Sequence, residues 1–293
     1  MYKKKAFLMR EKLFFLNEMV YLVVNHFFTR AFPILVSVIF LLSGCSDSDD
    51  RMPAAEGKIV ILMYHRITVD APANLYERSA AEFEADIKYL IDNNINIISF
   101  KDLEDIKRSG KMPQGHSAII CFDDGDRSGY ITAMPMLMKY RMNATFFLRA
   151  DMIGRDSFFT PLEIYYMSNI ALPGGIRPFT FGSHGYSHQL LLARKAGFAT
   201  PEEYNSFLDY EFGVSKKLIE TYTPVAVTVF ALPFGDGAGD PDIIAAAKRN
   251  GYSFIRTSVN GAIDNPGLDL YNIPSLPMLD VTTQDEIGYY LNN

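Results

Sequence analysis

Seven short runs of apolar residues, rich in β-branched and aromatic side chains, recur along the chain after residue 58. Runs of this length and composition are typical of buried strands. They are almost continuously apolar rather than alternating, which predicts a sheet covered on both faces. The seven predicted strands cover residues 59–63, 95–99, 117–122, 144–148, 178–181, 225–230 and 252–256.

Helical patterns lie between several of these runs. Residues 79–92 carry apolar side chains at helical spacing, and Ser79 with Glu82 forms a capping-box pattern at the start. Two further helices are predicted after Thr200 and Asp240, each with Pro at its first position. Strands and helices that alternate in this way predict a parallel α/β sheet with right-handed crossovers. Without its first 44 residues the chain is close to the ~250 residues of a single (β/α) barrel.

Polar side chains follow four of the predicted strands at the point where each strand ends. His65 follows the first strand, Asp123 and Asp124 follow the strand at 117–122, and the segment 182–188 follows the strand at 178–181. A turn that contains Pro233 and Gly235 follows the strand at 225–230. Because the carboxyl ends of barrel strands form one rim and build the active site, we expect these residues to converge.

His184 and His188 are four residues apart, so one helical turn would bring both imidazoles to the same face. Two His and one carboxylate leave open positions on a divalent ion, as in catalytic zinc sites. Asp123 and Asp124 are adjacent and point in different directions, so one carboxylate can bind the metal while the other takes a proton from water. The pattern predicts metal-assisted hydrolysis, whereas an iron(II) oxygenase triad is the alternative for the same ligand set.

The amino-acid composition excludes further classes of protein. The net charge is −6, so a basic face for nucleic acid is not expected. Two cysteines exclude a disulfide scaffold, and Cys121, inside a predicted strand, is expected to be a buried thiol. The chain has no Trp, so a surface that stacks on sugars must use Tyr and Phe.

Residues 1–44 have the pattern of a secretory signal, with basic residues, an apolar run at 31–42 and small residues before Cys45. The sequence Leu-Ser-Gly-Cys at 42–45 resembles the lipobox of bacterial lipoproteins, which implies a diacylated Cys45 as mature N-terminus. Residues 45–57 would then be the lipidated Cys and a polar tether. The acidic run within it fits a surface-export signal or a solvated spacer. A plain apolar anchor that starts near residue 20 is the alternative to the signal.

The segment 122–125, Phe-Asp-Asp-Gly, resembles the first motif of the polysaccharide deacetylases of carbohydrate esterase family 4. The segment 184–188 is similar to their second motif, His-Ser/Thr-x-x-His, with its two His as the matched metal pair. Segments 63–67, 144–148 and 231–235 extend the resemblance over most of residues 58–280. The most similar subgroup is that of the poly-N-acetylglucosamine deacetylases. The resemblance implies a distorted TIM-like barrel of (β/α)7 type, which we expect over residues 58–293.

The resemblance implies a role for each matched residue. Asp123 would be the general base, and Asp124, His184 and His188 would hold a divalent metal, with zinc favoured over cobalt or nickel. The expected reaction is removal of acetyl groups from an extracytoplasmic polysaccharide, with an N-acetylglucosamine glycan favoured. The alternatives are an O-acetyl xylan esterase and a catalytically impaired glycan-binding module. The expected location is a bacterial membrane, reached through the lipid anchor, at the outer membrane or cell surface.

Further residues are implied around the substrate. Pro233 and Phe234 would line the acetyl pocket, and Tyr64 is expected to contribute to substrate binding. The usual third motif carries an Arg that orients the base, and this Arg is absent at 231–233. The usual His of the C-terminal motif, which supplies the acid, is absent too. His65 is therefore the candidate acid, and the alternative is a hydrogen bond within the barrel rim.

Overall fold

The computed structural model describes residues 56–293. The predicted signal at 1–44, the lipidation site Cys45 and most of the tether at 45–57 lie outside the described residues. Within residues 56–293 no helix combines the length and the apolar character needed to cross a membrane.

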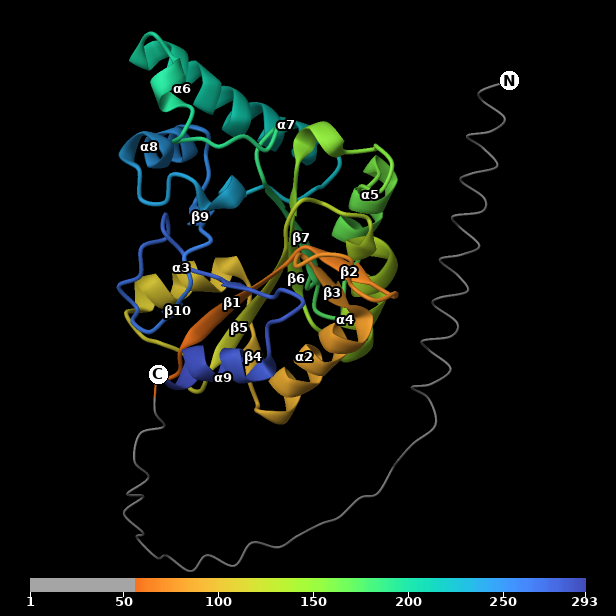
Figure 1. Ribbon diagram of the computed structural model, residues 1–293. Helices are drawn as coiled ribbons and strands as arrows, with labels where there is room; N and C mark the ends of the chain where they lie inside the picture. Colours follow the sequence, from red (N-terminus) through yellow and green to blue (C-terminus); the bar gives the residue numbers. More distant parts are fainter. Residues whose placement is uncertain (1–55) are drawn as a thin grey trace, which may run out of the picture. The chain divides into compact units, whose positions relative to one another are not determined.

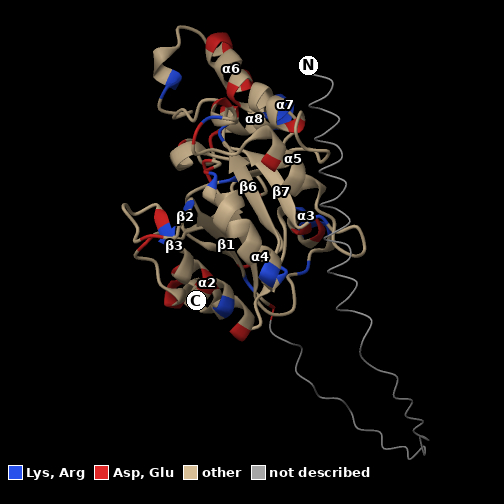
Figure 2. Cartoon of the chain, turned by 90° about the vertical axis from the view of Figure 1, so that its right-hand side faces the viewer, with Lys and Arg blue, Asp and Glu red and all other residues tan. Residues whose placement is uncertain are grey.

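In the view of Figure 2, basic and acidic residues are interspersed over α2, Ala80–Asp92, and α7, Ser215–Glu220.

A parallel sheet forms the centre of the fold. Its main path joins β1, β5, β6, β7, β8 and β9, each hydrogen-bonded in parallel to the next. The bounds are Ile59–Tyr64 for β1, Ser117–Phe122 for β5, Ala144–Leu148 for β6, Phe179–Ser183 for β7, Val229–Ala231 for β8 and Phe254–Arg256 for β9. Six of the seven predicted strands therefore form this path.

The C-terminal segment 270–278 connects the two ends of this path. On one side it pairs in parallel with β9, through Ile273 opposite Arg256. On the other side β11, Leu276–Pro277, pairs in parallel with β1. The seven parallel strands thus form a distorted (β/α) barrel, which confirms the predicted fold class. The sequence pattern did not indicate this last strand, because β11 is two residues long and includes a Pro.

Most helices pack outside the sheet, and Figure 1 shows them between successive strands. Ser79 and Thr200 cap their helices as predicted, each accepting a hydrogen bond from the backbone N–H three residues later, and Asp240 accepts from the N–H groups of both residue 242 and residue 243. Besides α2 and α7, the helices are α3 Phe100–Ser109, α4 Met134–Tyr140, α5 Pro161–Asn169, α6 Pro201–Asp209, α8 Pro241–Arg249 and α9 Gln284–Asn292. Buried residues of α2, α4, α5, α6, α7, α8 and α9 pack against the outer face of the sheet, whereas Phe100 and Leu103 of α3 pack against its inner face.

Alternate side chains of each strand supply two separate cores. In β1, Val60, Leu62 and Tyr64 belong to the larger cluster, which also includes buried residues of the outer helices. Ile61 and Met63 belong to the smaller cluster, with inward residues of β5, β6, β8 and β9. Both faces of the sheet are buried, as the continuous apolar runs predicted.

Two of the predicted elements are shorter than expected. The run 95–99 contains only the two-residue strand β4, Asn96–Ile97, beside the start of β5. The run 225–230 forms a strand only from residue 229. A small parallel sheet that the pattern did not predict, β2 Arg66–Thr68 with β3 Glu77–Ser79, projects from the end of β1. The remaining short strand, β10 Ala262–Ile263, pairs antiparallel with β1.

Candidate active site

The polar residues that end the strands lie at the same rim of the barrel. His65 follows β1, Asp123 and Asp124 follow β5, and His184 follows β7. His184 Nε2 lies 3.8 Å from an Asp123 oxygen and 3.7 Å from Asp124 Oδ1. His65 and Asp124 line the same cavity. The structure therefore brings together residues that are far apart in the sequence.

Three potential metal-ligand atoms converge at this rim: Asp124 Oδ1, His184 Nε2 and His188 Nε2, all within 4.8 Å of one another. The two Nε2 atoms are 3.2 Å apart, and His188 Nε2 is 3.3 Å from Asp124 Oδ1. Asp124 Oδ1 is buried and accepts no hydrogen bond from the described residues. A buried carboxylate oxygen without a donor, facing two imidazole nitrogens, fits a divalent cation.

The protonation of both imidazoles also fits this role. Burial lowers the pKa of His184, and burial together with the repulsion between the two imidazoles in their charged forms lowers the pKa of His188 to about 4. Both rings are therefore neutral near pH 7. His184 Nδ1 lies 2.9 Å from the carbonyl oxygen of Ala231 and donates to it, which leaves the Nε2 lone pair directed at the cluster.

The segment that carries both His is a loop, so the predicted helical turn from His184 to His188 is wrong. Gly185 has φ +79° and His188 has φ +56°, and neither value is helical. Asp124 also has a positive φ, +66°, in the turn after β5. The two imidazoles meet because this loop folds back, which a spacing of four residues cannot reveal.

Asp123 is held by an arginine from another strand. Its carboxylate is 2% exposed, and both oxygens accept hydrogen bonds from Arg256, at the end of β9. The guanidinium is fully buried, with its charge 5.3 Å from the centre of the Phe147 ring. Burial alone would raise the pKa of Asp123, but the charge of Arg256 reverses this effect and lowers it. The carboxylate is therefore ionised near pH 7, as a general base must be.

Arg256 is a site residue that the sequence motifs do not identify, because the family pattern places the orienting Arg at residues 231–233. The signal was present, since Arg256 is the last residue of a predicted strand, where the other polar site residues also lie. β8 and β9 are neighbours in the sheet, with Ala231 opposite Arg256. The guanidinium is thus supplied from the adjacent strand.

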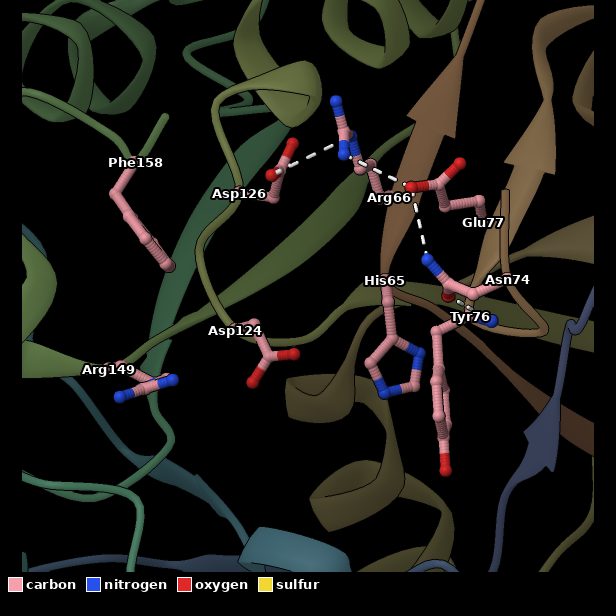
Figure 3. Close-up of a pocket in the computed structure, with 9 residues that line it drawn as sticks. All are labelled: His65, Arg66, Asn74, Tyr76, Glu77, Asp124, Asp126, Arg149 and Phe158. Carbon is pink, nitrogen blue, oxygen red and sulfur yellow. Dashed lines mark hydrogen bonds and ion pairs between the residues drawn. The ribbon is translucent and has the colours of Figure 1, made fainter. Parts of the chain in front are cut away.

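A cavity of about 200 Å³ opens beside the ligand cluster. The imidazole of His65 and the ring of Tyr76 lie side by side in it, with ring centres 5.0 Å apart (Figure 3). His65 Nδ1 is buried and has no hydrogen-bond partner among the described residues. The other lining residues are Arg66, Asn74, Glu77, Asp124, Asp126, Arg149 and Phe158. His65 therefore faces a polar cavity that can admit part of a sugar.

The three residues predicted to contact the substrate differ in how exposed they are. Phe234 is 66% exposed and its ring centre lies 4.5 Å from that of His188, so it is available to a ligand beside the cluster. Pro233 is buried. Tyr64 is 1% exposed, and its hydroxyl donates to Asp86 on α2, away from the rim. The structure thus corrects the prediction for Tyr64, whose alternate position in β1 directs it to the outer core.

Two other titratable residues lie away from the site. As the sequence predicted, Cys121 is fully buried; its thiol donates to the carbonyl of Leu62, and burial raises its pKa well above the ordinary value. His116 precedes β5, and its Nδ1 accepts a hydrogen bond from the backbone of Lys58 at the opposite end of the barrel. Neither residue takes part in the site.

The comparison with known families agrees with this geometry. Residues 110–255 match the family model described as polysaccharide deacetylase. This part of the chain is a polysaccharide deacetylase domain. The match confirms the predicted enzyme class, a hydrolase that removes acetyl groups from polysaccharides, and favours a divalent metal in the Asp124, His184 and His188 cluster.

Individual relatives span most of this deacetylase. The YxkH protein of Bacillus subtilis, named as a polysaccharide deacetylase, is 29% identical over 205 residues, which cover 70% of this chain and 66% of the relative. A poly-β-1,6-N-acetyl-D-glucosamine N-deacetylase of Staphylococcus epidermidis is 25% identical over 279 residues, 90% of this chain and 91% of the relative. The structure of IcaB from Ammonifex degensii is 23% identical, with a TM-score of 0.65, and the match covers 80% of this chain and 97% of that one. The last similarity supports the fold.

Proposed function

We propose that this deacetylase removes N-acetyl groups from a polysaccharide of N-acetylglucosamine, with poly-β-1,6-N-acetylglucosamine as the favoured substrate. The observation that carries the proposal is an ionised, Arg-held Asp123 next to three potential metal ligands, at the mouth of a polar cavity. The relative from Staphylococcus epidermidis, named for this substrate, supports the choice of sugar.

Asp124, His184 and His188 would hold the divalent ion, and zinc is favoured because neutral imidazoles and one carboxylate are its usual catalytic ligands. A metal bound there would polarise the acetyl carbonyl and acidify water. Asp123 accepts the proton from that water, since Arg256 keeps its carboxylate ionised. His65 lines the same cavity and donates a proton to the leaving amine, which departs poorly as an anion. Phe234 closes the side of the acetyl site next to His188.

The proposal extends to the location of the enzyme. Its substrate lies outside the cytoplasm, which agrees with the secretory signal and the lipidation of Cys45 that the sequence predicts. The deacetylase domain then covers residues 58–293 and the segment 45–57 is its tether. Incorporation of radiolabelled palmitate into the chain, and its loss in a Cys45→Ala variant, tests the anchor. An unlabelled wild-type chain would contradict it.

The activity is tested by acetate release from poly-β-1,6-N-acetylglucosamine, chitin oligomers and acetylated xylan. Each assay uses metal-stripped enzyme and then enzyme reconstituted with zinc, cobalt or nickel. We expect metal-dependent acetate from the glucosamine polymer. Release from xylan alone would identify an O-acetyl esterase. A folded, metal-loaded chain that releases acetate from none of them would favour the glycan-binding module, an alternative that loses one of its arguments because Arg256 supplies the arginine absent at 231–233.

A further inference from the structure

Glu211 is a buried carboxylate that the proposed reaction does not use. It is 1% exposed and lies in the π-helical turn Tyr210–Val214, between α6 and α7. Three consecutive residues of this turn, Glu211, Phe212 and Gly213, are buried, which a regular helix face does not achieve. Such π-helical insertions occur often at functional sites.

The carboxylate of Glu211 contacts the loop that carries both candidate His ligands. Its Oε2 accepts from the backbone N–H of Ser187 at 2.9 Å, and its Oε1 accepts from the Ser187 hydroxyl at 2.5 Å. Among the described residues Glu211 has no basic partner within ion-pair distance. The two donors of Ser187, the residue just before His188, are thus its principal partners.

The two His ligands differ in how the protein holds them. His184 is fixed by two hydrogen bonds, from its backbone N–H to Leu148 O and from its ring to Ala231 O, both 2.9 Å. The His188 ring contacts Asp124, His184 and Phe234, and its Nδ1 has no hydrogen-bond partner among the described residues. Its backbone has φ +56°, a conformation that is unfavourable for a residue with a side chain. The position of His188 therefore depends on the turn that precedes it.

The start of the same turn is shaped around Glu211. Gly185 has φ +79°, and a Cβ at this position would lie 2.9 Å from Glu211 Oε2. The second motif has Ser or Thr where this chain has Gly185. The carboxylate of Glu211 thus occupies the space that a side chain at 185 would need.

From these contacts we propose that Glu211 is a positioning residue for the metal site. By holding both donors of Ser187 it keeps the loop 184–188 in the strained shape that directs His188 Nε2 at Asp124. This inference rests on the proposed function, because it assigns a task toward the metal that the deacetylase would bind. It adds a residue from the helical run 201–220 to the site.

The test measures metal binding directly in the full-length chain. The variants are Glu211→Ala, which removes both acceptors, Glu211→Gln, which keeps the shape and removes the charge, and Ser187→Ala, which removes one of the two donors. The control is Glu220→Ala, on the same helical run, whose Oε1 accepts from the backbone of Val227 and not from the loop. Zinc affinity is measured by competition with a chromophoric chelator, and the visible spectrum of the cobalt form reports the ligand geometry.

We expect Glu211→Ala to raise the zinc dissociation constant by about 10- to 100-fold, the usual effect of losing a group that orients a metal ligand. Ser187→Ala should lie between this variant and wild type, and Glu211→Gln should restore most of the affinity and the wild-type cobalt spectrum. Glu220→Ala should bind zinc as wild type does. If Glu211→Ala does not fold, the inference is tested by the zinc affinities of the other proteins, which should fall from wild type through Glu211→Gln to Ser187→Ala.

Two results would overturn the inference, and they are distinguishable. Folded Glu211→Ala protein with unchanged zinc affinity and an unchanged cobalt spectrum would refute the role of Glu211 alone. A wild-type chain that binds no divalent metal would refute the metal site itself, and with it this role. Neither readout depends on knowing the true glycan.

Discussion

Replacing Arg256 with methionine removes the cation that holds Asp123. Methionine fills much of the same volume with apolar atoms and suits the surroundings, which include Met63 and Phe147. The change leaves a carboxylate that is 2% exposed without its ionic partner. The variant therefore tests both the stability of the barrel interior and the ionisation of the base.

The expected loss in the free energy of unfolding follows from the burial of both Arg256 and Asp123. Two unit charges about 4 Å apart attract by about 4 kcal/mol at an effective dielectric constant of about 20. No discount for solvent applies, because Arg256 is 0% exposed. Removing one partner of a buried pair costs about 3–5 kcal/mol in practice. We expect Arg256→Met to lose this amount from a total stability of about 5–15 kcal/mol, and to unfold at a urea concentration lower by about 1–2 M.

The assay pairs urea unfolding with acetate release. With Arg256 gone, burial raises the pKa of Asp123 relative to wild type and the carboxylate loses the group that orients it, so acetate release should fall by ~100-fold. In the double variant Arg256→Met with Asp123→Asn neither charge remains, so stability should largely return while activity stays lost. A single variant as stable as wild type, or a double variant no more stable than the single one, would refute the reasoning.

Four further outcomes follow. Asp123→Asn should abolish acetate release and keep the metal, whereas Asp124→Ala should lose the metal, as elemental analysis of the purified variants would show. Loss of metal from Asp123→Asn, or retention of metal by Asp124→Ala, would reverse the two assignments. Tyr64→Phe should leave KM and kcat unchanged and lower the free energy of unfolding by about 2 kcal/mol, because it loses only a hydrogen bond to the carboxylate of Asp86. A raised KM would restore Tyr64 to the substrate site. Burial raises the pKa of the Cys121 thiol above its ordinary 9.0, so the native protein should resist iodoacetamide at pH 8 by peptide mass spectrometry. Above about pH 9 the thiolate forms only in the unfolded chain, so the free energy of unfolding should fall as the pH rises past that value. Alkylation of the folded protein at pH 8 would contradict the burial of Cys121.

The barrel and most of the site could be predicted from the sequence because both depend on local patterns. Buried parallel strands read as apolar runs, and a polar residue at the end of each run marks the functional rim. Asp124, His184 and His188 were found in this way, and they converge as expected. Tyr64 was misplaced because neither a strand's register nor its inward face is visible when every residue of the strand is apolar or aromatic.

The remaining features depend on contacts between distant segments. Arg256 and Asp123 form a pair across the barrel interior, 133 positions apart in the chain. The support of His188 by Glu211 requires knowing that the loop after β7 lies against a π-helical turn. The shape of that loop depends on the positive φ of Gly185 and His188, which no spacing rule predicts.

The late position of β11 in the chain affects how this protein can fold. β1 gains its second parallel neighbour only from a segment more than two hundred residues downstream, where Ser275 also reaches Met63. Until that segment has been synthesised, the strand Ile-Val-Ile-Leu-Met-Tyr presents an open, apolar edge of the kind that recruits other chains. A topology with such distant pairings is also slow to form. The unfinished chain is therefore open to aggregation during its synthesis, and a break near its C-terminus would reopen the edge of the barrel beside the strand that ends at the catalytic rim.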